Sequence, residues 1–126
     1  MGKDLFDNFP EATRLFEELN DALHFSVSQL CFAGSAEDLQ LTENTQPAIF
    51  SVSAAALRTM EAAGFPQPDF VAGHSLGEYS ALFAARSLAA ANAVQTVRSR
   101  GRYMQEAVPL GTGAMAAVIG RRLEGN

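Results

Sequence analysis

A serine with a glycine two positions away on each side stands in the run Gly73-His74-Ser75-Leu76-Gly77. This five-residue pattern alone recurs by chance, but here a short apolar segment, residues 69–72, precedes it and a helical pattern follows it. That order is typical of a nucleophile elbow, a tight turn between strand and helix that exposes the serine hydroxyl at the end of a sheet. The expected chemistry is attack of Ser75 on an ester or thioester carbonyl to form an acyl-serine.

Each neighbour of Ser75 has an expected task in such an elbow. Gly73 and Gly77 are expected to lie where a side chain would collide with the adjoining elements, and glycine tolerates the unusual dihedral angles nearby. The backbone N–H of Leu76, at the start of the next helix, can donate to the oxyanion that forms on attack. His74 is expected to pack or hydrogen-bond within the elbow, because adjacent residues of an extended turn point apart.

A serine hydroxyl needs a general base, which is usually a histidine downstream of the nucleophile in sheets of the α/β-hydrolase type. The chain contains two histidines, His24 and His74, and neither follows Ser75. His24 ends an amphipathic helical pattern, where a solvated or half-buried histidine is the simpler interpretation. We therefore expect the catalytic base to lie outside these 126 residues.

Helical patterns surround the elbow, and they are read from apolar residues at three- and four-residue steps and from capping residues. A buried parallel strand needs a neighbour on both sides, yet the sequence offers only two strand patterns. We therefore expect an incomplete part of a larger α/β domain with a parallel sheet. The predicted elements are helices over residues 10–23, 46–63 with Gly64 as its stop, 77–86 and 90–108, a capping box at Ser35 and Asp38, and strands over residues 69–72 and 114–119.

Composition excludes several classes of protein. The chain is 48% apolar and 18% charged, as in folded globular proteins, and its net charge of −5 argues against a nucleic-acid partner. Cys31 stands alone, so no internal disulfide is expected and a cytoplasmic location is favoured. No apolar run reaches the ~20 residues of a membrane helix, and no targeting segment is visible, so we expect no membrane partner.

Two longer stretches make the sequence similar to a known family. They are residues 73–82, GHSLGEYSAL, and residues 100–120, in which RGRYMQEAVP runs into GTGAMAAVIG, and shorter matches occur at residues 1–5 and 45–48. On these residues the chain resembles malonyl-CoA:acyl carrier protein transacylases and the acyltransferase domains of fatty acid and polyketide synthases. The resemblance implies that malonyl-CoA acylates Ser75 and that the acyl group then passes to the phosphopantetheine thiol of acyl carrier protein, with no cofactor and no metal.

The resemblance also implies binding residues for the malonyl group. Arg100 matches the arginine that holds the malonyl carboxylate, and a planar guanidinium suits this task because it can donate two parallel hydrogen bonds. Helical spacing alone would leave Arg98 and Arg102 as equal candidates, each otherwise a solvated surface arginine. Gln46 is expected either near the active site or as a helix N-cap, and Met104 either lines the acyl pocket or belongs to the core.

Some parts of the family pattern are not found in these residues. They are a first strand with a Gly-Gln-Gly-Ser-Gln loop, the downstream histidine with its supporting glutamine or asparagine, and most of a small ferredoxin-like subdomain. We therefore expect residues 1–113 to form an incomplete acyltransferase core of α/β-hydrolase-like type and residues 114–126 to begin the subdomain. The function is assigned to the parent enzyme, and the chain alone is expected to be inactive.

Three alternatives stay open on the sequence. A serine esterase or thioesterase would share the elbow, but it does not account for residues 100–105 or 111–120. An acyltransferase module of a polyketide synthase would share all the matches, and a scaffold that only binds a carrier protein remains an option for the chain alone. The sequence does not fix the choice between malonyl and methylmalonyl groups, or the oligomeric state.

Overall fold

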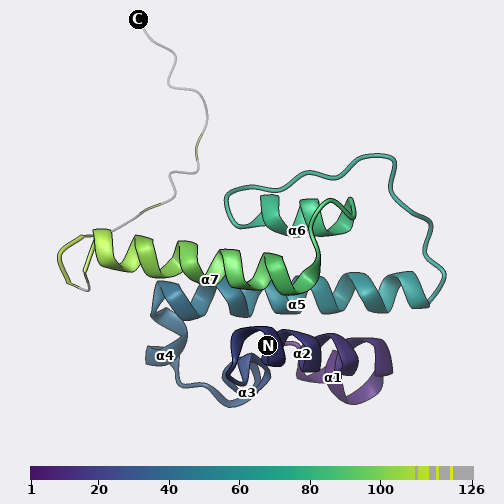
Figure 1. Cartoon of the computed structure of the whole chain (residues 1–126), viewed down its shortest axis with the longest axis horizontal. Helices are drawn as coiled ribbons and strands as arrows, with labels where there is room; N and C mark the ends of the chain where they lie inside the picture. The colour runs from purple at the N-terminus through teal and green to yellow at the C-terminus, as the bar shows by residue number, and fades with distance from the viewer. Residues whose placement is uncertain (110, 114–115, 117–119, 121–126) are drawn as a thin grey trace, which may run out of the picture.

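The computed structural model describes residues 1–109, 111–113, 116 and 120, and within them the regular structure is helical (Figure 1). The described helices are α1 (Lys3–Asn8), α2 (Pro10–Leu23), α3 (Val27–Ala33), α4 (Ala36–Gln40), α5 (Thr42–Ala62), α6 (Gly77–Ala84) and α7 (Ala90–Ala107). None of these described helices has both the length and the apolar character that crossing a bilayer requires.

Helix α5 lies at the centre of the described fold. It runs antiparallel to α7 and makes its most extensive contacts with it, while α2 packs against both (Figure 1). Helices α1–α4 cover one side of this pair and α6 covers the other. The core between α2, α5 and α7 contains Phe16, Phe50, Val94 and Val97, each 0% exposed. Burial of such side chains contributes about 1.5–3 kcal/mol each, so the α5–α7 pair is firmly anchored.

The predicted helix over residues 10–23 is confirmed as α2. Pro10 occupies its first turn, where a missing N–H costs nothing, and apolar residues at helical spacing are buried in the core. His24 caps the helix in a left-handed conformation with φ 57° and is exposed, as expected of a solvated histidine. Ser35 accepts a hydrogen bond from the Asp38 N–H at 3.0 Å and so caps α4, which confirms that capping signal.

Helix α5 begins one turn earlier than the predicted start at Gln46. Residues 42–45, which precede the predicted start, form the first helical turn, and Pro47 lies inside the helix. The end of the helix is as predicted, because Gly64 adopts φ 80° after it and the Phe65 N–H donates to the Met60 carbonyl at 3.1 Å. This is a Schellman arrangement, in which glycine tolerates the left-handed position.

The other predicted helices are confirmed with small shifts. Helix α6 ends at Ala84 rather than residue 86, and α7 ends at Ala107, one residue before its predicted end. Two short helices, α1 and α3, were not predicted. The sequence carried a signal for α3, because Ser26 caps it by accepting a hydrogen bond from the Gln29 N–H at 3.1 Å.

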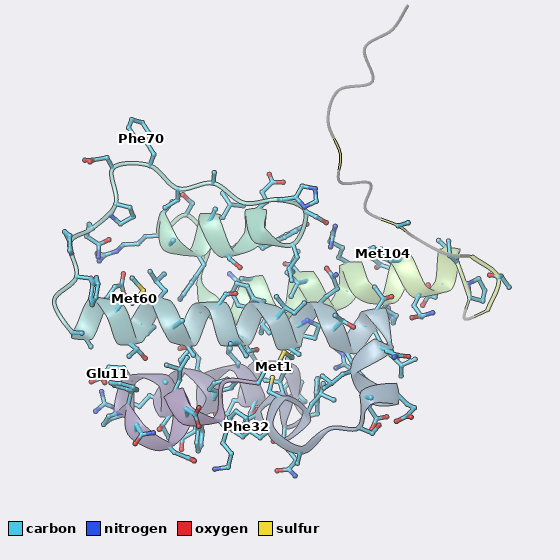
Figure 2. The ribbon with its side chains drawn as sticks, turned by 180° about the vertical axis from the view of Figure 1, so that it is seen from behind. Met1, Glu11, Phe32, Met60, Phe70 and Met104 are labelled. Atoms are coloured by element: carbon cyan, nitrogen blue, oxygen red, sulfur yellow. The ribbon has the colours of Figure 1, made fainter. Side chains whose placement is uncertain are left out.

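The predicted strand over residues 69–72 does not form, and the residues that the structure describes contain no strand. Phe70 is 93% exposed and points away from the helices (Figure 2). A strand depends on hydrogen bonds to a neighbour, and this segment has no described neighbour of that kind. The second predicted strand, residues 114–119, falls outside the described residues except for Ala116, as does nearly all of the predicted subdomain at 114–126.

Candidate active site

Ser75 sits in a strained turn at the start of α6. Its φ is 54°, a left-handed value that non-glycine residues rarely adopt and that costs about 1–3 kcal/mol. Two backbone hydrogen bonds hold the turn, from the Gly77 N–H to the His74 carbonyl at 2.9 Å and from the Glu78 N–H to the Ser75 carbonyl at 3.2 Å. Ser75 is exposed, so the turn presents its hydroxyl to solvent on a fixed backbone. This is the geometry of a nucleophile elbow.

The two glycines of the motif differ in their surroundings. A Cβ on Gly73 would lie 1.9 Å from the carbonyl carbon of Gly77, so no other residue fits there. The collision expected at Gly77 is not found, because no described atom lies within 4 Å of the Cβ position on this residue. Gly73 packs directly against the backbone of Gly77 and Glu78 at the start of α6. The Cβ position of Gly77 itself faces away from this contact, into open space.

Leu76 places an N–H beside the nucleophile. Its side chain is 8% exposed and belongs to the hydrophobic core, which anchors the residue in a right-handed helical conformation at the N-cap of α6. Among the described residues its N–H has no hydrogen-bond partner. A free N–H at a helix N-terminus, next to the attacking oxygen, is suited to donate to a developing oxyanion.

Arg100 joins the elbow to helix α5. Its Nη2 donates to Ser75 Oγ at 2.9 Å, and its Nη1 donates to Gln46 Oε1. Its Cζ lies 5.9 Å from the ring centroid of Tyr79, which packs against the core. The structure therefore brings together Ser75, Arg100 and Gln46, which come from the elbow, α7 and α5.

A close approach of α5 and α7 makes this meeting possible. A Cβ on Gly101 would lie 2.6 Å from the Thr42 carbonyl oxygen and 2.9 Å from Glu43 Cα. The first turn of α5 thus rests on the backbone of α7 at the residue next to Arg100. Only glycine permits this distance, which brings the Gln46 amide within reach of the guanidinium.

The neighbouring arginines of α7 have other partners. The Arg98 guanidinium lies 4.1 Å above the centroid of Phe25, a cation–π contact on the opposite part of the helix surface. Arg102 pairs with Glu106 at 3.4 Å and its side chain is 60% exposed. Of the three arginines that helical spacing left as candidates, Arg100 is the one whose guanidinium hydrogen-bonds to Ser75.

Met104 lies one turn beyond Arg100 and is 36% exposed (Figure 2). Together with Arg100 and Tyr103 it lines an apolar hollow of about 420 Å³. The core alternative for Met104 therefore does not hold among the described residues. Ser75 is not among the residues that line this hollow.

The two histidines do not contact the nucleophile. His74 is exposed, and among the described residues its ring makes no hydrogen bond; its carbonyl is the part that holds the turn. His24 lies at the end of α2 and is likewise without a side-chain hydrogen bond in the described chain. The prediction that a base comes from outside these residues stays a prediction.

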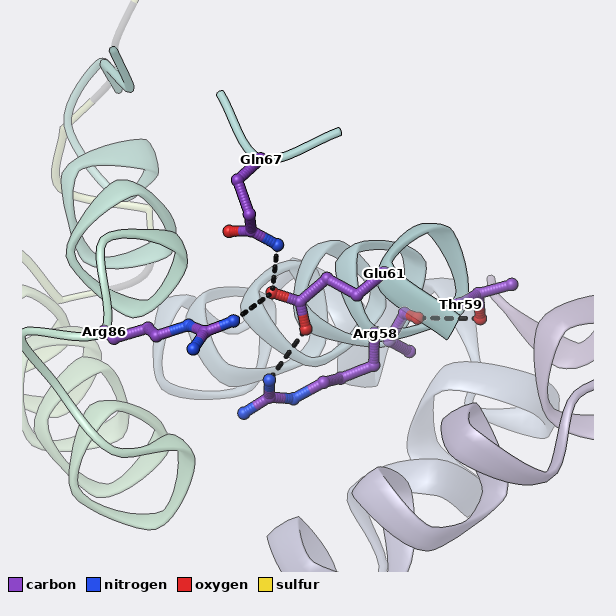
Figure 3. Close-up of polar contacts among 6 residues, drawn as sticks. Arg58, Thr59, Glu61, Gln67 and Arg86 are labelled. Atoms are coloured by element: carbon purple, nitrogen blue, oxygen red, sulfur yellow. Dashed lines mark hydrogen bonds and ion pairs between the residues drawn. The ribbon is translucent and has the colours of Figure 1, made fainter. Parts of the chain in front are cut away.

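A polar cluster holds the two ends of the segment that contains the elbow (Figure 3). Glu61 of α5 accepts hydrogen bonds from Arg58 at 2.8 Å and from Gln67 at 3.4 Å, and it pairs with Arg86, after α6, at 3.8 Å. Burial would raise the pKa of Glu61, but the two hydrogen bonds and the charges of Arg58 and Arg86 outweigh burial, so its pKa is lowered. Glu61 thereby links α5 to the start of the loop, through Gln67, and to the segment after α6, through Arg86.

Comparison with known proteins agrees with this geometry. The sequence matches the family model described as the acyl transferase domain over residues 1–124. It is 52% identical over 124 residues to the malonyl CoA-acyl carrier protein transacylase of Bacillus subtilis (strain 168), which aligns 98% of this chain with 39% of that protein.

Solved structures give the same result. The malonyl CoA-acyl carrier protein transacylase of Coxiella burnetii matches with a TM-score of 0.84 at 42% identity, covering 88% of this chain and 35% of that one. A malonyl-transacylase in complex with the acyl carrier protein of a type II polyketide synthase matches with a TM-score of 0.81 at 41% identity, covering 86% of this chain and 35% of the other. This chain thus spans less than two fifths of the length of these relatives.

Proposed function

Because the chain belongs to the acyl transferase domain family and shares its fold, we propose that it is the nucleophile-bearing part of a malonyl-CoA:acyl carrier protein transacylase of fatty acid biosynthesis. The single observation that carries this proposal is the Arg100 guanidinium, which donates to both Ser75 Oγ and Gln46 Oε1. A cation beside the nucleophile suits an acyl group that itself bears a carboxylate.

The proposed reaction has two transfers. Ser75 Oγ attacks the thioester carbonyl of malonyl-CoA, the carbon–sulfur bond breaks, coenzyme A leaves as its thiol and a malonyl-serine ester forms. The phosphopantetheine thiol of acyl carrier protein then attacks that ester, and Ser75 regains its proton. The Leu76 N–H supplies one oxyanion donor in both steps, and the base that moves the proton comes from a part of the enzyme outside this chain.

Arg100 is proposed to select the malonyl group. In malonyl-serine one CH₂ group separates the free carboxylate from the ester carbonyl, so the carboxylate lies within reach of a guanidinium that already hydrogen-bonds to Ser75 Oγ. Binding of the carboxylate would replace the hydrogen bond that Arg100 Nη2 now makes to Ser75 Oγ. Gln46 then stays beside the guanidinium as its orienting partner, and Met104 borders the acyl group from the next turn of α7.

The surrounding architecture is part of the same proposal. Residues 69–72 and 114–119 are proposed to become strands of the parent enzyme's parallel sheet, with residues 1–113 in the large core and residues 114–126 at the start of the small subdomain. The exposed side chain of Phe70 supports this, because an apolar residue at such a position needs a neighbouring layer to cover it. A cytoplasmic location, predicted from the single cysteine, belongs to the proposal as well.

A type II polyketide synthase is the second setting that we consider, because one of the matching structures is a malonyl-transacylase from such a system. The chemistry at Ser75 and Arg100 would be unchanged, and only the carrier protein would differ. Comparison of transfer rates to fatty acid and polyketide carrier proteins distinguishes the two settings.

The test is the covalent intermediate in the full-length protein that contains this chain. Incubation with malonyl-CoA should add the mass of one malonyl group to a peptide containing Ser75, as measured by intact-protein and peptide mass spectrometry. Ser75→Ala should abolish the adduct while the variant stays folded. A malonyl adduct of equal amount in the alanine variant would refute the assignment of Ser75.

A further inference from the structure

Helix α5 begins without a cap from its own sequence. The first N–H groups of a helix need acceptors, and α3 and α4 receive them from Ser26 and Ser35. The N-cap of α5 is Leu41, whose side chain carries no acceptor. Gln105 of α7, 63 residues away in sequence, provides one, because its Oε1 accepts from the Thr42 N–H at 3.0 Å.

This contact lies on the same two helix faces as the contact between Gln46 and Arg100. Thr42 and Gln46 are one turn apart on α5, and Arg100 and Gln105 lie on either side of Gly101 on α7. The antiparallel helices are thus joined at two points, Thr42 to Gln105 and Gln46 to Arg100, with backbone contact at Gly101 between them. The first point fixes the position of the turn that carries Gln46.

We infer that Gln105 is a positioning residue for carboxylate recognition. Its amide oxygen holds the first turn of α5 on α7, which places Gln46 Oε1 against the Arg100 guanidinium and aims that guanidinium at Ser75. Gln105 itself does not contact the reacting atoms. This inference rests on the proposed function, because it gives Gln105 an effect only on acyl groups that bear a carboxylate.

The structure also provides a matched control for Gln105. Gln95, on the same helix, makes a hydrogen bond of the same kind to another helix, because its Nε2 donates to the Ala22 carbonyl of α2 at 2.8 Å. Loss of that bond removes one side-chain bond between helices but leaves the Gln46–Arg100 contact in place. Each of Gln95→Met and Gln105→Met removes one side-chain hydrogen bond between helices, an exposed one that Gln95 donates and a part-buried one that Gln105 accepts, and only the second lies beside the site.

The experiment measures kcat/KM for malonyl-CoA and acetyl-CoA in the full-length protein. Gln105→Met, which keeps the shape but removes the amide oxygen, should lower the malonyl value about 3- to 10-fold, the equivalent of one ordinary hydrogen bond, and leave the acetyl value within twofold. Gln105→Glu keeps an acceptor oxygen, at a helix N-terminus that favours negative charge, and should restore the malonyl value. Gln95→Met should leave the ratio of the two values unchanged.

A second variant tests the same contact if Gln105→Met does not fold. Gly101→Ala pushes the same turn of α5 away from α7 and should also lower the malonyl value selectively. Equal losses for both substrates in Gln105→Met, or an equal change of the ratio in Gln95→Met, would overturn the positioning role. If Arg100→Ala lowers kcat/KM equally for malonyl-CoA and acetyl-CoA, the proposed function fails. If Arg100→Ala lowers kcat/KM selectively for malonyl-CoA, but Gln105→Met and Gly101→Ala do not, only the positioning role of Gln105 fails.

Discussion

The guanidinium of Arg100 is the residue-scale feature on which the proposed substrate selection depends. It is half-buried between the elbow and α5, and both of its terminal nitrogens donate to uncharged oxygen atoms of the described chain. A cation whose described hydrogen-bond partners are neutral is well suited to receive an anionic group.

We predict that Arg100→Ala in the full-length protein lowers kcat/KM for malonyl-CoA by tens- to thousands-fold, because a sheltered carboxylate left without its partner costs about 2–5 kcal/mol. Transfer of an acetyl group should be unchanged or faster. Arg100→Lys keeps the charge without the planar fork and should be intermediate. The measurement is steady-state kinetics with both substrates.

Arg102→Ala is the appropriate control for this prediction, since Arg102 pairs with Glu106 at the surface. Arg98→Ala is less suitable, because it removes the contact with Phe25 and so loses packing as well as charge. Equal losses of malonyl and acetyl transfer in Arg100→Ala and Arg102→Ala would make Arg100 a structural residue.

At the scale of elements, the loop that contains the elbow depends on how α5 and α6 are tied together. Glu61 provides this tie, because it meets Arg58 on its own helix, Gln67 in the turn after it and Arg86 beyond α6. Arg58 in turn lies 4.8 Å from the ring centroid of Phe83 on α6. The elbow is thus positioned from both ends by one carboxylate.

We predict that Glu61→Gln lowers the free energy of unfolding at pH 7 by about 1 kcal/mol. The lowered pKa of Glu61 means that its contribution is present above the ordinary value of 4.5 and is lost as the pH falls through the folded-state pKa. The difference between variant and wild type should therefore shrink in acid. Urea unfolding of the full-length protein from pH 7 to pH 3 measures it.

Glu106→Gln is the matched control, since Glu106 makes a single ion pair with Arg102 and both side chains are at least 60% exposed. Its effect should be close to zero at every pH, as for most surface pairs. A difference for Glu61→Gln that stays constant down to pH 3 would show that its charge contributes nothing.

The sequence was informative about elements with a local signal. Amphipathic spacing predicted α2 and α7, and glycine predicted the end of α5, because each of these features depends on residues close together in the chain. The start of α5 was missed because its acceptor, Gln105, is 63 residues away. The predicted strand at residues 69–72 could not be confirmed for a similar reason, since a strand is defined by a partner and not by its own residues.

In the candidate site, too, features that depend on adjacent residues could be predicted, and contacts between distant residues could not. The motif around Ser75 indicated the elbow directly, because its residues are adjacent in the sequence. Arg100 could not be chosen over Arg98 and Arg102 from helical spacing, because the contacts that distinguish it, with Ser75 and Gln46, come from residues far away in the sequence. Gln105 lies in the stretch at residues 100–105 that carries the family resemblance, but no role for its side chain follows from that match. A helix with leucine at its N-cap is a reason to look for an acceptor elsewhere.

At the scale of the whole molecule, the described chain holds the proposed nucleophile Ser75, one proposed oxyanion donor, the Leu76 N–H, and the Arg100 guanidinium. No described histidine or carboxylate hydrogen-bonds to Ser75 Oγ. We predict that the 126-residue chain assayed alone transfers no malonyl group above background. A general base contributes about 10²–10⁴-fold. The resemblance also implies a second oxyanion donor, a glutamine of the Gly-Gln-Gly-Ser-Gln loop that these residues do not contain, and loss of such a donor costs about 10²–10³-fold. A transfer assay of the purified chain beside the full-length protein measures this, and comparable rates would disprove it.

The backbone contact at Gly101 limits which residues can occupy position 101. Glycine is already the smallest residue, so no substitution at position 101 can bring α5 closer to α7, and every substitution must move them apart. Substitutions at this position can therefore weaken the contact between Gln46 and Arg100 but cannot shorten the distance between the two helices that carry it. If the proposed function holds, we expect new acyl preferences to arise more easily at the exposed Met104 end of α7, where side chains can grow or shrink without separating the helices.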